Sequence, residues 1–235
     1  MGTLYLVPTP IGNLADITLR ALRILFSVDV IACEDTRRTG SLLEKLLKEF
    51  SPNPEEKKKP HLLSYYDQIE QQRIPEIISI LQAGQNVALV SDAGTPAVSD
   101  PGFKLVRECI AADVHITSLP GASSVLTALT ISGLPTDKFL FMGYPPHKPG
   151  HRIDFFKDIA TSLESVTSTV ILFEAPHKIL RTLADMQSVY GDIPIVLCRE
   201  LTKIYEEVRR EPISRALIHF KKKAPKGEFV LLFHL

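Results

Sequence analysis

Cysteine is scarce in this sequence, and long apolar runs are missing. The three cysteines, Cys33, Cys109 and Cys198, are too widely spaced to indicate a disulfide framework or a zinc site, which fits a reducing cytoplasm. No apolar run is long enough to span a bilayer, and the first residues lack the cationic segment of a signal peptide. We therefore expect a cytoplasmic protein without a membrane segment.

The sequence also lacks an excess of charge and the usual nucleotide fingerprints. Lys plus Arg and Asp plus Glu each number 27. Because dedicated nucleic-acid binders usually carry a basic excess, an RNA substrate would need a local basic surface. No G-x-G-x-x-G follows the first expected strand and no G-x-x-x-x-G-K-[ST] occurs, so dinucleotide and P-loop nucleotide sites have no support. No cluster rich in His or Cys predicts a metal.

What is present is an alternation of strand and helix patterns. Hydrophobic residues make up 45% of the 235 residues and charged residues 23%, which is typical of a globular protein of one or two domains. Buried strands are expected at 3–7, 28–33, 62–64, 86–90, 114–119, 137–143, 169–173, 193–198 and 228–234. Helices are expected at 16–25, 41–50, 74–83, 102–112, 123–132, 153–163, 178–190 and 213–223. This order predicts an α/β fold with a mainly parallel sheet.

The pattern of expected strands, helices and loops changes after Pro120, so we predict domains at 1–119 and 120–235. Asp16 is expected to cap the first helix, and Asp100-Pro101-Gly102 matches an ordinary helix start. Segment 51–60, rich in Pro and Lys, is expected to be a solvated loop.

Distinctive loops follow four of the early strands, at 8–14, 34–37, 91–102 and 120–124. Because ligands of parallel α/β sheets bind beyond the carboxyl ends of the strands, these loops are expected to form one site. Each loop taken singly could also be a turn with a helix cap, but four at successive strand ends favour a site.

The loop chemistry suits a small ligand with polar and cationic parts. Gly94 and Gly121 allow the backbone to approach closely, and Asp92 can complement a sulfonium or ammonium charge. Ser123 and Ser124, at an expected helix start, can cap that helix or bind ligand oxygens.

Taken together, these stretches closely resemble the ribosomal RNA 2′-O-cytidine methyltransferase family of the tetrapyrrole methylase superfamily. The matching stretches run in order over nearly the whole chain, at 4–14, 32–37, 91–102, 119–124, 173–178 and 198–203. The longer matches are specific to the family, and Pro120-Gly121 is shared by the superfamily.

The resemblance implies two αβα domains with a mainly parallel N-terminal sheet and a mixed C-terminal sheet, a cofactor cleft between them and a homodimer. It implies S-adenosylmethionine as donor and a decoding-region cytidine of 16S ribosomal RNA, naked or in the assembled small subunit, as acceptor. By similarity, cofactor contacts fall on Pro10, Ile11, Ser91, Asp92, Thr95, Ser123, Ser124 and Glu174.

A ribose hydroxyl must lose its proton before it attacks, and Glu34 and Asp35, at the mouth of the expected sheet, are both candidate bases. Glu34 aligns with the acidic catalytic position of the superfamily's tetrapyrrole branch. Arg37 and Arg38 can hold a phosphate or pair with these acids. His177 can act as a base, an RNA contact or merely a helix-start residue.

The best candidate RNA-binding loop lies at 144–152, where Lys148, His151 and Arg152 offer positive charge and Tyr144 an aromatic ring for stacking. The alternative is a solvated loop. Arg199, in the last matching stretch, completes the RNA candidates.

Many relatives continue past the last strand into a basic C-terminal extension, whereas this sequence ends at Leu235, and the Lys-rich stretch 221–226 can replace part of it. Two rival functions also fit these sequence features. One is a methyltransferase of the same superfamily that acts on a tetrapyrrole or another small acceptor. The other is a catalytically silent module that binds S-adenosylmethionine.

Overall fold

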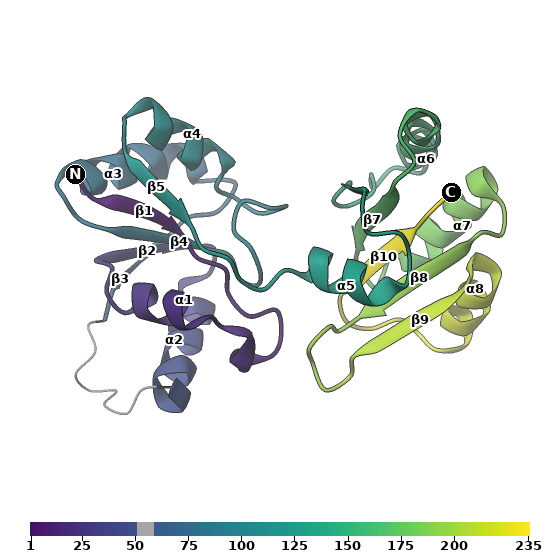
Figure 1. Ribbon diagram of the computed structural model, residues 1–235, viewed down its shortest axis with the longest axis horizontal. Coiled ribbons are helices and arrows are strands. Elements are labelled where there is room, and N and C mark those ends of the chain that lie inside the picture. Colours follow the sequence, from purple (N-terminus) through teal and green to yellow (C-terminus); the bar gives the residue numbers. More distant parts are fainter. Residues whose placement is uncertain (51–58) are drawn as a thin grey trace. The chain divides into compact units, whose positions relative to one another are not determined.

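The computed structural model describes residues 1–50 and 59–235, so most of the expected loop at 51–60 lies outside the described residues. The chain divides into two compact units, Met1–Ser123 and Ser124–Leu235. Each unit holds a five-stranded sheet covered by helices (Figure 1).

The first unit has an all-parallel sheet in the order β3-β2-β4-β1-β5. Its elements are β1 (Thr3–Leu6), η1 (Leu14–Asp16), α1 (Leu19–Leu25), β2 (Val30–Cys33), α2 (Thr36–Phe50), β3 (His61–Ser64), α3 (Glu70–Gln82), β4 (Val87–Val90), α4 (Phe103–Ala111) and β5 (His115–Ser118). The central strands β2 and β4 are apolar and buried at every residue, as expected for a parallel sheet covered on both faces.

Two hydrophobic clusters show how the helices of the first unit cover its sheet. Side chains of α1 and α2 pack against Ile31, Cys33 and Val90 on one face. Side chains of α3 and α4 pack against the alternate strand residues, such as Ala32 and Leu89, on the other face. The unit is therefore an αβα sandwich, with α1 and α2 below the sheet and α3 and α4 above it in Figure 1.

The second unit has a mixed sheet in the order β6-β7-β10-β8-β9, in which β6 pairs parallel with β7 and the other neighbouring strands pair antiparallel. Its elements are α5 (Ser124–Ser132), β6 (Phe139–Phe141), α6 (Pro149–Ser165), β7 (Thr169–Glu174), α7 (Ile179–Tyr190), β8 (Pro194–Arg199), β9 (Glu207–Pro212), α8 (Ile213–Lys222) and β10 (Phe229–Phe233). Helices α6, α7 and α8 share one core with one face of this sheet, whereas α5 contacts β10 outside that core.

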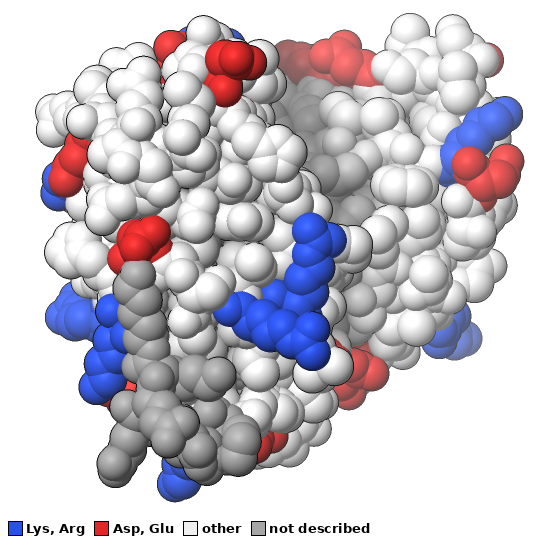
Figure 2. All heavy atoms as spheres, turned by 60° about the vertical axis from the view of Figure 1, so that its left-hand side comes forward, with Lys and Arg blue, Asp and Glu red and all other residues white. Residues whose placement is uncertain are grey.

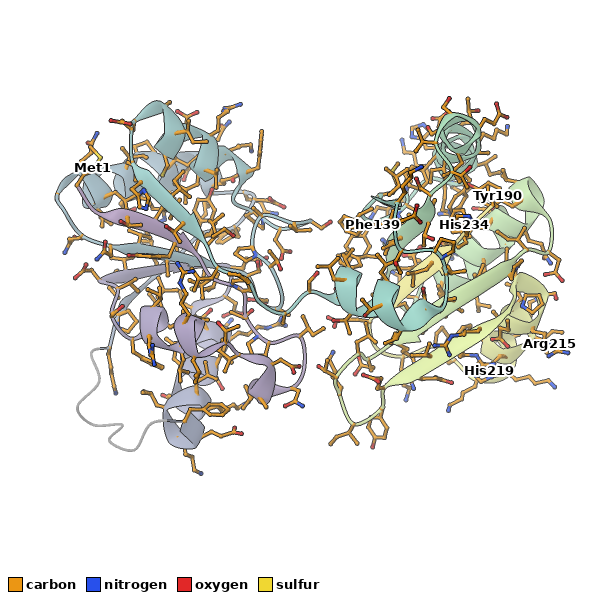
Figure 3. The ribbon with its side chains drawn as sticks, viewed as in Figure 1. Met1, Phe139, Tyr190, Arg215, His219 and His234 are labelled. Carbon is orange, nitrogen blue, oxygen red and sulfur yellow. The ribbon has the colours of Figure 1, made fainter. Side chains whose placement is uncertain are left out.

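Two side chains labelled in Figure 3, Tyr190 and His234, make hydrogen-bonding contacts that link elements of the second unit. The hydroxyl of Tyr190 donates to the Phe156 carbonyl at 2.6 Å, and its ring packs on Phe233. Next to the C-terminus, His234 Nδ1 lies 3.3 Å from the Thr169 hydroxyl. In the part of the chain that the structure describes, no helix is long and apolar enough to cross a membrane.

The predicted α/β class and the mixed second sheet are confirmed, but several helix starts were wrong. Asp16 belongs to η1, and Thr18 caps α1 by accepting the Ala21 amide at 3.0 Å. Helix α2 begins at Thr36, five residues before the predicted start, because Asp35 caps it. Helix α4 has Gly102 rather than Asp100 at its N-cap position.

Strand β9 was missed because its sequence, Glu207-Val208-Arg209-Arg210-Glu211-Pro212, has no apolar run. It is an edge strand that pairs only with β8, so solvent can reach its charged side chains. Arg209 pairs with Glu207 and Glu211 at 3.2 and 2.7 Å, which satisfies much of that charge within the strand.

Candidate functional site

The carboxyl edge of the first sheet gathers the loops that follow β1, β4 and β5. Thr9 and Gly94 exchange two backbone hydrogen bonds of 2.9 and 3.0 Å, and the Thr9 hydroxyl donates to the Ser91 carbonyl at 3.1 Å. The Thr95 hydroxyl donates to the carbonyl of Ala122 in the loop after β5, also at 3.1 Å. The predicted convergence of these loops is therefore confirmed.

The loop after β2 joins the same edge through charged side chains. Glu34 Oε1 accepts the backbone N–H of Asp92 at 3.2 Å, and Arg38 pairs with Asp92 Oδ2 at 2.7 Å. These contacts hold the Glu34 carboxyl beside the start of the longest loop, 91–102.

Two buried oxygens at this edge can meet a ligand. Asp92 Oδ1 has no hydrogen-bond partner among the described residues, and Ser91 Oγ faces the Asp100 carboxyl. A buried polar atom without a partner costs about 1–3 kcal/mol, so such atoms in a folded protein point to a missing partner. In the β1 loop Pro10 is buried and Ile11 is half-buried, with the Ile11 side chain against Gly94. This arrangement fits a small polar and cationic ligand such as S-adenosylmethionine.

The environment of Glu34 disfavours the charged form of its carboxyl group. Burial, followed by the negative charges of Asp100, Asp92 and Asp67, raises the pKa of the Glu34 carboxyl above its ordinary value. A carboxylate in this environment binds a proton more strongly than an exposed one does. Burial also raises the pKa of Asp100, with help from the charges of Asp92 and Asp67.

Asp35 is engaged in a different role. Its Oδ1 accepts the backbone N–H groups of Arg37 and Arg38 at 2.8 and 3.3 Å, so it caps helix α2. These hydrogen bonds lower the pKa of the Asp35 carboxyl, with a smaller contribution from the two guanidinium groups. Of the two predicted bases, the geometry favours Glu34.

A second carboxylate, Glu70, fixes the far end of loop 91–102. It is buried, and its Oε1 accepts the Tyr65 hydroxyl at 2.7 Å and the Gly102 N–H at 3.2 Å, while Lys104 pairs with Oε2 at 3.0 Å. Burial opposes ionisation, but these three donors together lower the pKa of Glu70. Sequence reasoning missed this residue, which lies four residues before the helix predicted at 74–83, whereas α3 begins at Glu70.

Gly121 is required by a close approach between two of the loops. A Cβ atom at Gly121 would lie 2.6 Å from Pro8 Cβ, closer than real Cβ atoms come. We predict that Gly121→Ala costs about 1–3 kcal/mol of stability by overpacking and weakens cofactor binding by displacing the β1 loop. Calorimetric titration with S-adenosylmethionine, together with urea unfolding, would test this.

The matched control is Gly150→Ala, which falls within helix α6 where nothing lies within 4 Å of the added Cβ. There we expect unchanged binding and a gain of roughly 0.5–1 kcal/mol, since Ala is the better helix former. Equal binding by Gly121→Ala and the wild type would show that the loop contact is not needed.

In the second unit, the structure turns Glu174 inward. Its carboxylate is buried, accepts the Ala175 N–H at 2.8 Å and forms a short hydrogen bond with the Thr182 hydroxyl. The Glu174 side chain therefore stabilises the turn between β7 and α7. A cofactor contact at Glu174, like those at Ser123 and Ser124, stays a prediction.

Two of the predicted RNA-binding arginines make contacts within the second unit, and RNA binding by them stays a prediction. Arg152 is only 3% exposed, pairs with Asp185 at 2.5 Å and donates to the carbonyls of Pro146 and His147 at 3.2 Å. It is buried because α6 begins at Pro149, inside the predicted loop 144–152, and points Arg152 toward α7. Arg199 pairs with Glu207 across β8 and β9 at 2.9 Å.

The other basic candidates remain accessible. Lys148, His151 and His177 are exposed, and Lys178 Nζ lies 3.1 Å from His147 Nε2, which joins the β6–α6 loop to the β7–α7 turn. Tyr144 is 55% exposed and packs at an angle against Phe173, with ring centroids 5.5 Å apart. Among the described residues, no group of three or more His, Cys, Asp and Glu is placed to hold a metal.

Two α/β units, with loops that converge at the carboxyl edge of the first sheet, are features that this chain shares with a known family. The family model for tetrapyrrole (corrin/porphyrin) methylases matches residues 3–217, so this chain belongs to that family. Several curated relatives carry the name ribosomal RNA small subunit methyltransferase I. The protein of that name from Synechocystis sp. strain PCC 6803 is 45% identical, over 99% of this chain and 78% of the relative.

Two further relatives of the same name differ in length. The one from Escherichia coli O157:H7 is 44% identical over 98% of this chain, which spans 77% of that relative. The one from Thermotoga maritima is 41% identical over 99% of this chain, which spans 98% of that relative.

Solved structures show the same fold at low sequence identity. Cobalt precorrin-4 methyltransferase matches with a TM-score of 0.69 at 17% identity, over 98% of this chain and 94% of that one. A uroporphyrin-III C-methyltransferase from Thermus thermophilus, solved with S-adenosyl homocysteine, matches with a TM-score of 0.64 at 16% identity, over 98% of this chain and 97% of that one. These likenesses confirm the tetrapyrrole methylase fold.

Proposed function

We propose that this chain transfers a methyl group from S-adenosylmethionine to the ribose 2′-hydroxyl of a cytidine in the decoding region of 16S ribosomal RNA. The observation that carries the proposal is the near full-length similarity to proteins named ribosomal RNA small subunit methyltransferase I, at 41–47% identity. The carboxyl-edge site supports it, because a half-buried carboxylate, Glu34, and the unpartnered Asp92 Oδ1 lie at one end of the first sheet.

The residues of the first unit suit this cofactor. When bound, S-adenosylmethionine supplies an electrophilic methyl group on a sulfonium centre. We place it against Pro10, Ile11, Ser91, Asp92 and Thr95, where the free Asp92 Oδ1 complements positive charge and Ser91 Oγ offers a further polar contact. Asp92 is itself held by the Glu34 carboxyl and the Arg38 guanidinium, so its position is fixed before a ligand arrives.

Glu34 removes the proton of the ribose hydroxyl in this mechanism. Its carboxyl already accepts one hydrogen bond from the Asp92 N–H, which orients it, and partial burial keeps water from competing. A positioned base contributes typically about 10²–10⁴-fold to the rate, and alignment of the reacting atoms contributes roughly 7–11 kcal/mol. Arg37 is exposed in the first turn of α2 and can hold an adjacent phosphate, and Arg38 can do so through its other nitrogens while Nη1 stays paired with Asp92.

The pH dependence of the reaction follows from the raised pKa of Glu34. The carboxylate is the active form, so the rate falls as the pH drops through that pKa, and this acid limb lies above the ordinary value for Glu of about 4.3. Because the Asp100 charge contributes to the shift, we predict that Asp100→Asn moves the limb to lower pH, as measured from kcat against pH.

The control for this prediction is Asp113→Asn, in the turn between α4 and β5. Asp113 has a φ of 55°, a conformation that Asn also adopts readily, and it does not contribute to the shift at Glu34. An acid limb that stays in place in Asp100→Asn would contradict the assignment of Glu34 as the titrating base.

The acceptor is tested by offering labelled S-adenosylmethionine with either small ribosomal subunits that lack the modification or a porphyrinogen. We expect label on the subunits alone. Label on the porphyrinogen would favour a small-acceptor methyltransferase of the same family. Cofactor binding without label on either acceptor would favour a silent binding module.

The proposal also covers the location of the protein, its oligomeric state and its RNA contacts in the second unit. We place it in the cytoplasm and expect a homodimer, with Lys148, His151 and His177 as RNA contacts in the second unit. A relative from Thermotoga maritima, 98% of which this chain spans, carries the name ribosomal RNA small subunit methyltransferase I, so the matched region alone is compatible with an RNA substrate.

A further inference from the structure

Helices α1 and α2 lie side by side on one face of the first sheet and begin at its carboxyl edge. Each helix follows a strand, β1 or β2, so its first turn lies at the edge where the candidate site is and its last turn at the opposite edge. Ala21 and Leu25 of α1 and Leu43 and Leu46 of α2 share one hydrophobic cluster, which fixes the two helices as a layer.

The outer surface of this layer carries four exposed arginines. Arg20, Arg37 and Arg38 lie in first turns, at the edge of the site, and Arg23 lies in the last turn of the seven-residue helix α1. Arg20 and Arg23 of α1 are exposed, and neither has an ion-pair partner among the described residues. Arg37 and Arg38, in the first turn of α2, have side chains 93% and 72% exposed. Figure 2 shows Lys and Arg side chains gathered together on the face that it draws. We call Arg20, Arg23, Arg37 and Arg38 the basic face.

The centre of the same edge carries the opposite charge. Glu34 accepts the Asp92 N–H at 3.2 Å, and the charges of Asp92 and Asp67 raise the pKa values of both Glu34 and Asp100, so these four acidic residues lie near one another. A phosphate is repelled from such a centre and attracted to a basic rim, whereas a neutral ribose hydroxyl can enter it. The edge is therefore suited to a substrate with anionic groups on either side of a neutral reacting group.

We propose that the basic face binds the phosphate backbone of the RNA strand next to the methylated nucleotide. This inference rests on the proposed function and adds Arg20 and Arg23 to the RNA-binding residues. Arginine suits phosphate because its planar guanidinium donates two parallel hydrogen bonds. A membrane is the less favoured partner, because Leu19 is the only large exposed apolar side chain on α1.

The test is the double charge reversal Arg20→Glu/Arg23→Glu, with binding to small subunits and to 16S RNA fragments measured against salt. We expect at least about a tenfold loss of RNA affinity and a matching rise in KM for the subunit, with kcat at saturating RNA and the affinity for S-adenosylmethionine unchanged. Single Ala variants are expected to reduce the slope of log K against log salt by about 1 each.

The matched control is Arg181→Glu/Arg215→Glu, which makes the same change in net charge on exposed helical positions of the second unit (Arg215 is labelled in Figure 3). A loss of RNA affinity no larger than in this control, or retention of wild-type protein by phosphatidylserine vesicles rather than by RNA, would overturn the basic face. If the wild type binds RNA through these arginines but labels no subunit, the proposed function fails while the basic face stands.

Discussion

Replacing Glu34 by Gln is expected to lower kcat by about 10²–10⁴-fold, because the amide cannot accept the proton of the ribose hydroxyl. The substitution preserves shape, and the Gln carbonyl oxygen can still accept the Asp92 N–H, so the site is expected to stay assembled. Affinity for S-adenosylmethionine should therefore stay within a few-fold of wild type. Single-turnover methylation of small subunits and calorimetric titration of the cofactor measure the two quantities separately.

Asp35→Asn is the matched control, since it removes the same charge one residue further along the chain. Asn caps helices about as well as Asp does, so α2 and its first turn should persist. We expect kcat to change by only a few-fold. A large loss in Asp35→Asn together with near wild-type turnover in Glu34→Gln would assign the base to Asp35 instead.

The second large effect is on stability, at Arg152. Truncation to Ala leaves the Asp185 carboxylate unpaired beside the core and removes the donors to the Pro146 and His147 carbonyls. Breaking a buried ion pair costs about 3–5 kcal/mol, so we expect Arg152→Ala to unfold the second unit at a much lower urea concentration. Circular dichroism during urea titration would measure the shift in midpoint.

Lys148→Ala separates this role from RNA binding. Lys148 is exposed at the N-cap position of the same helix and makes no side-chain capping bond, so its removal should leave the urea midpoint nearly unchanged. We expect it instead to weaken RNA binding if the β6–α6 loop contacts phosphate. Normal stability of Arg152→Ala with weakened RNA binding would favour RNA binding as the main role of Arg152.

Much of the fold was predictable because parallel strands buried on both faces form short apolar runs. The segments Val30-Ile31-Ala32-Cys33 and Val87-Ala88-Leu89-Val90 mark β2 and β4 without ambiguity. Helix starts were harder, because several residues near a helix start can cap it. Thr18 caps α1 and Asp35 caps α2, whereas Asp16 and Asp100 are not at the N-cap positions of α1 and α4.

Within the site, the sequence predicts which loops meet but not which side chains face the ligand. The loops converge because a parallel sheet brings its carboxyl ends to one edge. The burial of Arg152 depends on Asp185, which is 33 residues away in the chain, and the role of Glu70 depends on Gly102, 32 residues away. The pattern of neighbouring residues cannot show such long-range contacts. Only the structure distinguishes the buried Arg152 from the exposed basic residues near it in the sequence.

The proposed reaction is tested most directly by mapping the methyl group. Small subunits that lack the modification would be incubated with wild-type protein and labelled S-adenosylmethionine, and the RNA would then be digested with nucleases and analysed by mass spectrometry. We expect one labelled cytidine, methylated on its ribose, in the decoding region, and about 10²–10⁴-fold slower formation of the same product with Glu34→Gln. Label on a base, on another nucleotide or on a ribosomal protein would contradict the proposed reaction.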